Sequence, residues 1–380
     1  MASDITSAET ALLMTLEGLL SGGTIKPGGA LSGRKVLVAG NRSGLITCAL
    51  AKAGADVTAH AFDIHHVRAI RERLKEAGLD ESIVRCTSNI PEGPYERAYF
   101  MTTPLSMTGE LVLDQLEDIR ANLVTGGELF AAFEGDPQEA LKTMKKAFAR
   151  VHVMPTPSQS RRDRRRGALS MFRTVKGDAD AGAKRRDFAA EWTASVPGGE
   201  LRTFTSLPGC FCHRRADMGG LALAETACAR LSGTDADELH VLDMGCGCGF
   251  VGLLVADFLR SQGRKVRLTL LDSHARALAA AKINVQRLGF PEARLVLADD
   301  GLPADDAKAY DLFLGNPPYY GDWRIAETFI ATAHRTLRTG GICLTVARSE
   351  GGLREIQAKA FGKSEVIRRR GYCVFSSICT

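Results

Sequence analysis

Val241-Leu242-Asp243-Met244-Gly245-Cys246-Gly247-Cys248-Gly249 is the stretch of the chain that decides its fold. It starts as a short apolar run, which predicts a buried strand, and ends in alternating glycines, which predict a tight turn. A helix-like apolar segment, residues 251–259, follows directly. A strand, a glycine turn and a helix in this order are typical of a doubly wound α/β sheet, whose parallel strands are covered by helices on both faces.

The same pattern occurs twice in the chain. Val36-Leu37-Val38-Ala39-Gly40 matches the strand and the first glycine of the later stretch, and a helix-like segment, residues 45–53, follows it. In each copy a second strand runs to an aspartate, which is Asp63 in the first copy and Asp272 in the second. The repeat predicts two tandem Rossmann-like domains of one doubly wound architecture.

The length of the chain and a change in its composition locate these two domains. A chain of 380 residues is long enough for two domains that each bury a core of their own. The small and polar stretch Asp178 to Gly182 separates the two copies. We therefore expect one domain over residues 34–178, a second over residues 188–380, and a leader with one amphipathic helix over residues 1–33.

The glycine loop of the second copy is a candidate cofactor site, because glycines let a ligand approach the backbone where a Cβ would intrude. Asp243 lies two residues before the first glycine, and a carboxylate there suits the ammonium and sulfonium groups of S-adenosylmethionine better than a pyrophosphate. Aspartates at the next two strand ends can accept the ribose hydroxyls and meet the adenine amine. We expect the cofactor to be held by Asp243, Gly245, Gly247, Gly249, Asp272, Asp299 and Asp300.

The first copy differs at the positions that such a site requires. Val38 stands in the place of Asp243, and Arg42 stands in the place of Gly247. A valine cannot bind an ammonium group, and an arginine would extend a long side chain into the pocket. We therefore predict that the first domain is degenerate and binds no cofactor, and that its Asp63 is a helix cap or a remnant of the fold.

A second motif, Asn316-Pro317-Pro318-Tyr319, lies just beyond the apolar strand Leu312-Phe313-Leu314. Its prolines fix the backbone and remove the N–H donors. The Asn316 amide oxygen and a rigid carbonyl can then accept both hydrogens of a planar amine, which stabilises the nitrogen as it gains positive charge while attacking a methyl group. Tyr319 can stack on the flat group. We expect Asn316, Pro317, Pro318 and Tyr319 to carry the catalysis.

Charge is unevenly distributed along the chain. The formal net charge is +5, but residues 161–187 carry ten Lys and Arg against four Asp, a local charge of +6, so the rest of the chain sums to −1. A short basic stretch suits contact with a phosphate backbone. A solvated connector is the alternative reading of these charges.

Cysteines and apolar runs exclude several classes of protein. The ten cysteines are scattered and include no CxxC pair, so we expect reduced thiols and no bound metal. No apolar run approaches the ~18 residues of a membrane-spanning helix, and the N-terminus lacks the features of a signal peptide. The expected location is the cytoplasm, without membrane contact.

The glycine loop, Asp272 and the Asn-Pro-Pro-Tyr tetrapeptide together resemble the class I S-adenosylmethionine-dependent methyltransferases that modify exocyclic or amide nitrogens. The tandem layout is similar to that of the bacterial ribosomal RNA guanine-N2 methyltransferases of the RsmC and RlmG type, which pair a degenerate N-terminal fold with an active C-terminal one. Leu207 to Cys212 and Ala216 to Gly219 also resemble this family's lead-in to its active domain, although the family usually has serine at Cys212 and phenylalanine at Tyr319. The resemblance covers roughly residues 34–380.

The resemblance implies transfer of a methyl group from S-adenosylmethionine to the exocyclic N2 amine of a guanine in ribosomal RNA or a ribosomal subunit. Asn316 and Pro317 would hold this amine, Tyr319 would stack on the base, and the first domain would aid folding and grip RNA. Arg368-Arg369-Arg370 ends the second sheet, where it resembles the basic stretch of the first. We expect substrate contacts from Phe211, Arg214, Arg164, Arg165 and Arg166.

Three other functions fit parts of the sequence. A protein glutamine N5-methyltransferase also uses this tetrapeptide, but such enzymes typically have a small helical N-terminal domain rather than a repeated sheet. A DNA adenine N6-methyltransferase would use the same chemistry, but no target-recognition domain is evident. A non-catalytic RNA-binding or assembly factor would have lost both sites, which the intact Asp243 and Asn316 argue against.

Overall fold

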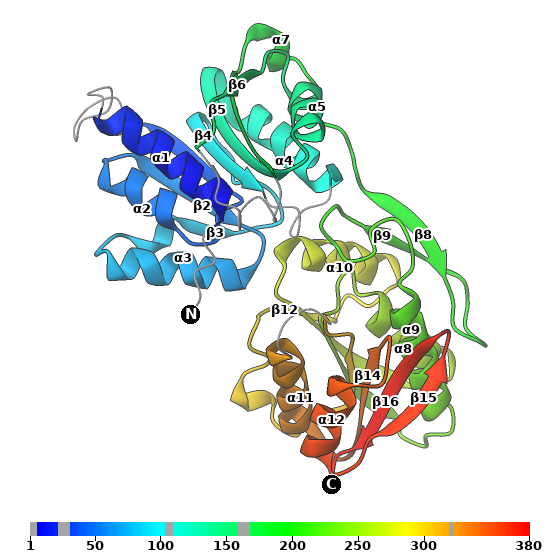
Figure 1. Ribbon diagram of the computed structural model, residues 1–380. Coiled ribbons are helices and arrows are strands. Elements are labelled where there is room, and N and C mark those ends of the chain that lie inside the picture. Colours follow the sequence, from blue (N-terminus) through cyan, green and yellow to red (C-terminus); the bar gives the residue numbers. More distant parts are fainter. Residues whose placement is uncertain (1–5, 22–30, 103–108, 158–167, 319–322) are drawn as a thin grey trace. The chain divides into compact units, whose positions relative to one another are not determined.

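The computed structural model describes residues 6–21, 31–102, 109–157, 168–318 and 323–380 (Figure 1). The chain divides into two compact units, Met1–Phe188 and Ala189–Thr380, which we call unit 1 and unit 2.

Unit 1 is built on a seven-stranded sheet, counted over its described residues, with the strand order β3-β2-β1-β4-β5-β7-β6. The first five strands of that order pair in parallel, whereas β7 runs antiparallel to both β5 and β6. The strands are β1 (Lys35–Ala39), β2 (Asp56–Ala61), β3 (Val84–Cys86), β4 (Tyr95–Thr102), β5 (Leu123–Gly135), β6 (His152–Met154) and β7 (Ala168–Val175).

Helices cover both faces of this sheet (Figure 1). Alternate residues of β1 point to opposite faces, as the two-residue period of a strand requires, so Val36 and Val38 join one core while Leu37 and Ala39 join the other. The first core is closed by α1, α2 and α3, and the second by α4 and α5. The helices are α1 (Ser7–Ser21), α2 (Leu45–Lys52), α3 (Ile64–Glu76), α4 (Gly109–Asn122), α5 (Pro137–Ala147) and α7 (Asp178–Ala181), with a 3-10 turn η1 (Glu81–Ile83).

Unit 2 repeats this architecture with the strand order β12-β11-β10-β13-β14-β16-β15, so the predicted pair of doubly wound sheets is confirmed. A separate two-stranded sheet, β8 with β9, precedes it. The strands are β8 (Ala190–Ala194), β9 (Arg202–Ser206), β10 (Glu238–Met244), β11 (Lys265–Asp272), β12 (Arg294–Leu297), β13 (Tyr310–Gly315), β14 (Leu337–Ala347), β15 (Glu365–Arg369) and β16 (Tyr372–Ile378).

The helices of unit 2 also form two layers. Val241 of β10 packs with α8, α9 and α10, whereas its neighbour Leu242 packs with α11 and α12. The helices are α8 (Met218–Leu231), α9 (Phe250–Ser261), α10 (Ala275–Arg287), α11 (Arg324–Thr336) and α12 (Gly352–Phe361), with a 3-10 turn η2 (Ala304–Asp306). Among all helices of the described ranges, none is long and apolar enough to cross a membrane.

The repeat extends to helices that the sequence pattern did not pair. Helix α1, in the stretch that we expected to be a leader, packs on β5 and α2, and its Leu12 and Leu16 are fully buried. In unit 2, α8 packs in the same way on β14 and α9. The loops that precede α2 and α9 also agree in backbone conformation, because Gly44 and Gly249 both adopt the left-handed region at φ 80° and 79°. Helices α1 and α8 are therefore equivalent elements of the two units.

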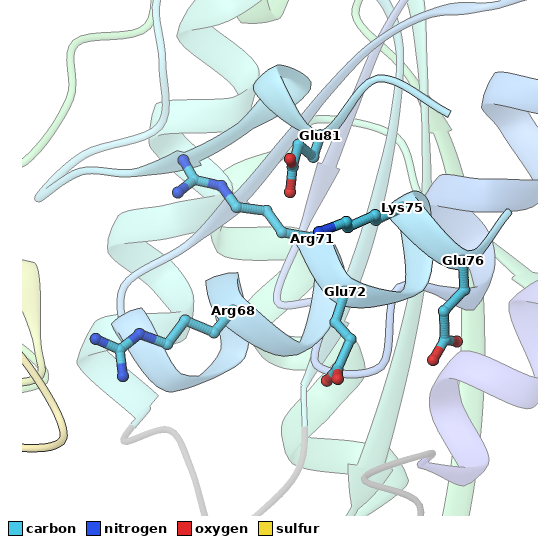
Figure 2. A pocket seen from close by; sticks show the side chains of 6 residues that line it. All are labelled: Arg68, Arg71, Glu72, Lys75, Glu76 and Glu81. Carbon is cyan, nitrogen blue, oxygen red and sulfur yellow. The ribbon is translucent and has the colours of Figure 1, made fainter. Parts of the chain in front are cut away.

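A hollow on the surface of unit 1 runs along α3 (Figure 2). Basic and acidic side chains face it together, and the Arg71 guanidinium donates a hydrogen bond to the Val84 carbonyl at 3.1 Å. Such a mixed set of solvated charges has no preference for a ligand of either sign, so we place no site here. The hollow is lined by Arg68, Arg71, Glu72, Lys75, Glu76 and Glu81.

Candidate active site

The two sequence motifs of unit 2 lie side by side at one edge of its sheet. Strands β10 and β13 are parallel neighbours, and their register pairs Met244 with Gly315. The glycine loop and Asn316 therefore start at the same level, at the carboxyl ends of the strands, where doubly wound sheets bind their ligands. Phe329 of α11 packs beneath both, since a Cβ on Gly245 would lie 2.8 Å from its ring and a Cβ on Gly315 would lie 3.0 Å from it.

The glycine loop requires glycine for two different reasons. Gly245, Gly247 and Gly249 all have positive φ, at 68°, 56° and 79°, which other residues rarely adopt. At Gly249 a Cβ would also lie 3.0 Å from Leu253, whereas at Gly247 it would meet nothing within 4 Å. The space beside Gly247 is therefore open, as a ligand that lies against the backbone requires.

Asp272 at the end of β11 connects the glycine loop to α10. Its Oδ2 accepts a hydrogen bond from the Gly247 N–H at 2.8 Å, and its Oδ1 accepts one from the His274 N–H at 2.9 Å. The side chain is half-buried. An ionised carboxylate can accept about four hydrogen bonds, so holding the loop is compatible with the predicted contact to ribose hydroxyls.

Asp243 at the end of β10 is 3% exposed. Its Oδ2 accepts a hydrogen bond from the Gly252 N–H at 2.8 Å, inside the first turns of α9. Burial raises the pKa of Asp243 to about 7, and the negative charge of Asp272 adds to the rise. Asp243 thus lies behind the glycine loop, and a cation bound on the open side of the loop would stabilise its ionised form.

These features fit S-adenosylmethionine. The open space beside Gly247 gives room against the backbone, and the two repelling carboxylates favour a cation over a pyrophosphate. Asp299 is half-buried and Asp300 is exposed in the turn after β12, and the preceding Ala298 N–H donates to the Asp272 carbonyl at 3.1 Å. The predicted acidic residues therefore lie along successive strand ends of the same edge.

The tetrapeptide motif is described as far as Pro318. Pro317 is buried, and Pro318 and Asn316 are half-buried, while Tyr319 lies outside the described residues. The Asn316 Nδ2 donates a hydrogen bond to Oδ2 of Asp217 at 2.7 Å. Asp217 is the N-cap of α8, so the amide of the motif is connected to the start of a helix far away in sequence.

The loop between β9 and α8 carries the two remaining substrate candidates of unit 2. Phe211 is 72% exposed, and Arg214 is exposed with a left-handed backbone at φ 73°. The Ser206 Oγ fixes this loop, because it accepts hydrogen bonds from the Arg214 N–H at 3.1 Å and from the Trp192 Nε1–H at 3.3 Å. The loop leads directly into the N-cap Asp217.

Two polar residues of this site have roles that the sequence did not predict. One is Asp217, and the other is Asn284 on α10. It is fully buried, its Oδ1 accepts from the Thr205 N–H at 2.7 Å, and its Nδ2 donates to the carbonyls of Thr205 and Cys248 at 2.8 and 2.9 Å. It therefore ties the glycine loop to β9. A lone asparagine on the apolar face of a helix was the available signal, because such a residue must satisfy its amide internally.

Two groups of arginines that we associated with RNA have partners within the protein. Arg369 and Arg370 form ion pairs with Glu225 of α8, whose side chain is 5% exposed, and Arg368 pairs with Glu350. A buried carboxylate requires such counter-charges. The Arg368 side chain is still 77% exposed, so contact of this stretch with RNA stays a prediction.

Three arginines in the described part of the basic stretch 161–187 have acidic partners. Arg173 pairs with Glu128, Arg185 pairs with Asp114, and Arg186 pairs with Glu117, all within unit 1. Part of the local charge of +6 is therefore balanced within unit 1. Arg164, Arg165 and Arg166 lie outside the described residues, and their role remains a prediction.

The cysteines of the loop are uncharged. Cys246 and Cys248 are buried, and burial raises the pKa of each thiol far above its ordinary value, with a further contribution to Cys246 from the nearby aspartates. All ten cysteines are free. Within the part of the chain that the structure describes, no group of three or more His, Cys, Asp or Glu side chains is arranged to hold a metal ion.

Known proteins share both the fold and part of the sequence. Residues 201–376 match the model of the methyltransferase small domain family. The chain is 28% identical to the ribosomal RNA large subunit methyltransferase G of Streptomyces avermitilis, over 90% of this chain and 85% of that protein. It is also 28% identical to the ribosomal RNA small subunit methyltransferase C of Shewanella pealeana, over 51% of this chain and only 54% of that protein.

The fold of both units is found in a solved structure. RsmC of T. thermophilus, a 16S rRNA N2 methyltransferase in complex with AdoMet and guanosine, matches 94% of this chain and 91% of its own with a TM-score of 0.74 at 18% identity. The strand order, the two neighbouring motifs and the similar proteins all indicate a methyltransferase fold. Unit 2 carries a methyltransferase small domain, and the chain as a whole is similar to the bacterial ribosomal RNA methyltransferases of the C and G types.

Proposed function

We propose that the chain transfers a methyl group from S-adenosylmethionine to the exocyclic N2 amine of a guanine in ribosomal RNA. The observation that carries the proposal is the register of β10 with β13, which brings the glycine loop and Asn316 to neighbouring strand ends. The names of the relatives support ribosomal RNA as the substrate class, and the guanosine bound to the structural neighbour supports a guanine. Such a substrate would place the reaction in the cytoplasm.

The residues around the loop would hold the cofactor. The open backbone at Gly247 would accept it, Asp272 would receive the ribose hydroxyls, and Asp299 or Asp300 would meet the adenine amine. Asp243 would stabilise the positive charges from behind the loop, because its buried carboxylate ionises more readily beside a cation. When bound, S-adenosylmethionine supplies an electrophilic methyl group on a sulfonium.

Asn316 and Pro317 would hold the nucleophile. Since the Asn316 Nδ2 donates to Asp217, its Oδ1 is the atom that can accept a hydrogen of the guanine amine, together with the Pro317 carbonyl. The amine nitrogen forms a bond to the methyl carbon while the bond from that carbon to sulfur breaks. The nitrogen gains positive charge in this step and then loses a proton to water, so no strong base is needed.

Recognition of the RNA would use groups on both units. On unit 2, the exposed Phe211 can stack on a base, and Arg214 can contact a phosphate. On unit 1, we assign backbone contacts to Arg164, Arg165 and Arg166. An enzyme that extracts a base from folded RNA needs such contacts to fix its position along the RNA backbone.

Comparison of modified guanines in ribosomal RNA from cells with and without the gene tests this function. We expect one N2-methylguanine to disappear without the gene and to return with the wild-type chain but not with Asn316→Ala. Purified protein should also transfer a labelled methyl group to ribosomal RNA or to a ribosomal subunit. Label on a protein glutamine, or no label with any ribosomal substrate, would overturn the proposal.

A further inference from the structure

We propose that Asp217 is a positioning residue for methyl transfer, which fixes the Asn316 amide so that its oxygen faces the substrate amine. The inference rests on the proposed function of Asn316 and extends it to a residue on another element. Asp217 lies 99 residues before Asn316 and reaches it at the N-terminus of α8.

The contact selects one of two orientations of the amide. A free asparagine side chain can exchange its oxygen and nitrogen by rotating half a turn. An ionised carboxylate only accepts hydrogen bonds, and the Asp217 Oδ2 accepts one from the Asn316 Nδ2 at 2.7 Å. In the opposite orientation two oxygens would face each other and repel. The carboxylate therefore holds the Asn316 Oδ1 on the side away from itself.

Asp217 is itself held in place by the helix that it caps. Its Oδ2 also accepts from the Gly220 N–H at 2.7 Å, and its Oδ1 accepts from the Gly219 N–H at 3.2 Å. A Cβ on Gly220 would lie 3.0 Å from this carboxylate, and a Cβ on Gly219 would lie 3.0 Å from the Tyr372 ring. Gly220 thus makes room for the acid, while the two backbone donors prevent it from turning away.

Unit 1 provides an internal comparison, because α1 is equivalent to α8. There the capping side chain is Thr6, whose Oγ1 accepts from the Glu9 N–H at 3.0 Å. Phe100 pairs with Ala39 as Gly315 pairs with Met244, so Met101 occupies the position of Asn316. The acid and the amide are therefore both missing from the degenerate copy.

This comparison separates the two roles of Asp217. Threonine is an adequate N-cap, so helix capping alone does not require an aspartate at this position. The aspartate occurs in the unit that also has Asn316. The remaining role, orientation of the amide, therefore accounts for the carboxylate.

Asp217→Ser is the sharpest variant, because serine also caps helices but is too short to reach Asn316. We expect the kcat of methyl transfer to fall by about 10- to 100-fold, the effect of losing one charge-assisted hydrogen bond in the transition state. The cofactor Kd and the KM for RNA should stay within about threefold, because the Asp217 carboxylate is engaged by Asn316 and the first turn of α8. Asp136→Ser is the matched control, since Asp136 caps α5 through the Gln138 N–H at 2.8 Å.

The kcat of a double variant distinguishes a positioning role of Asp217 from a merely structural one. If Asp217 acts through Asn316, its loss should cost no further activity in Asn316→Ser, a variant that keeps an acceptor oxygen and a residual rate but has no amide for Asp217 to orient. The pair Asp217→Ser with Asn316→Ser should therefore have the kcat of Asn316→Ser alone. Multiplied losses, or a normal kcat for Asp217→Ser, would overturn the positioning role. Lost cofactor binding and a lowered unfolding temperature in Asp217→Ser, without change in Asp136→Ser, would assign the residue to folding and overturn it as well. Failure of the wild-type chain to methylate RNA would instead show that the proposed function is wrong, and the inference with it.

Discussion

The Glu9 Oε1 accepts a hydrogen bond from the Leu45 N–H at 3.1 Å, at the first residue of α2. In unit 2 the equivalent of Glu9 is Gly220, and the equivalent of Leu45 is Phe250. The first N–H of α2 is therefore satisfied by a side chain of unit 1. At the equivalent place in unit 2, Gly220 has no side chain that could do the same. This contact gives a structural reason, beyond Val38 and Arg42, why we predict that unit 1 binds no cofactor.

Replacing Glu9 with glutamine tests the cost of this buried acid. Burial raises the pKa of Glu9 above its ordinary value of 4.5, so the folded state holds the proton more tightly than the unfolded state. The contribution of Glu9 to the unfolding free energy of unit 1 should then be greatest below pH 4.5 and be lost as the pH rises through the raised pKa. Glu9→Gln should flatten this fall, measured by calorimetry of the full chain, while Glu139→Gln on the surface of α5 should leave it unchanged. An unaltered pH dependence in Glu9→Gln would refute the explanation.

Asn316→Ala should abolish methyl transfer and leave the cofactor affinity within a few-fold. The side chain contacts Asp217, whereas the glycine loop lies between β10 and α9 and is held by Asp272 of β11. Single-turnover transfer and calorimetric titration with S-adenosylmethionine measure the two quantities on one preparation. Equal loss of both would mean that the residue is structural.

The affinity for S-adenosylmethionine should depend on pH through Asp243. Its pKa of about 7 means that the carboxyl is protonated in acid, where it offers the cation no attraction. Affinity should therefore rise by up to about tenfold between pH 6 and pH 8. Asp243→Asn should bind weakly and lose most of this rise, and S-adenosylhomocysteine, which lacks the sulfonium, should show less of it in the wild type. An equal rise in Asp243→Asn would exclude this residue as the cause.

Gly247→Arg copies the residue that unit 1 has in the same place, which is Arg42. The side chain would extend into the open space beside the loop, so cofactor binding should fall by more than about 100-fold. Gly263→Arg is the control, because Gly263 also has a positive φ, of 79°, and open space around it, but lies in the turn before β11. Both positions have a positive φ, 56° and 79°, so both variants carry backbone strain. Equal binding losses in the two would indicate general destabilisation.

Changing Arg164, Arg165 and Arg166 together to alanine should weaken RNA binding and flatten its dependence on salt. Each lost phosphate contact reduces the number of counterions that are released on binding, which lowers the slope of log K against log salt. Arg368→Ala is the comparison, since that side chain already pairs with Glu350. An unchanged slope in the triple variant would remove residues 164–166 from the RNA interface.

Local sequence patterns were sufficient to predict the sheets and the edge where the motifs meet. A strand, a glycine turn and an acid at the next strand end are features of neighbouring residues, and parallel strands bring their carboxyl ends together without further information. The predicted capping role of Asp63 is confirmed, because it accepts from the His65 N–H at 2.8 Å. Capping is local, so it can be read from a single stretch of chain.

Contacts between distant residues could not be predicted in this way. Asp217 and Asn316 are 99 residues apart, and the partners of Arg369 and Arg370 lie on α8, more than a hundred residues earlier. Neither pairing follows from spacing or composition. The ion pairs of the basic stretch 161–187 were hidden for the same reason, since counting charges ignores the acids of α4 that meet Arg185 and Arg186.

The common strand order of the two units has a consequence for how such a protein changes over time. Unit 1 has the same architecture without equivalents of Asp217, Asn316 and the open glycine loop. Its two hydrophobic cores are therefore sufficient to maintain that architecture. Selection for shape and selection for reactivity have thus acted on separable sets of atoms. A degenerate unit of this kind can therefore acquire a different function, because its core packing does not depend on the residues that unit 2 uses for its reaction.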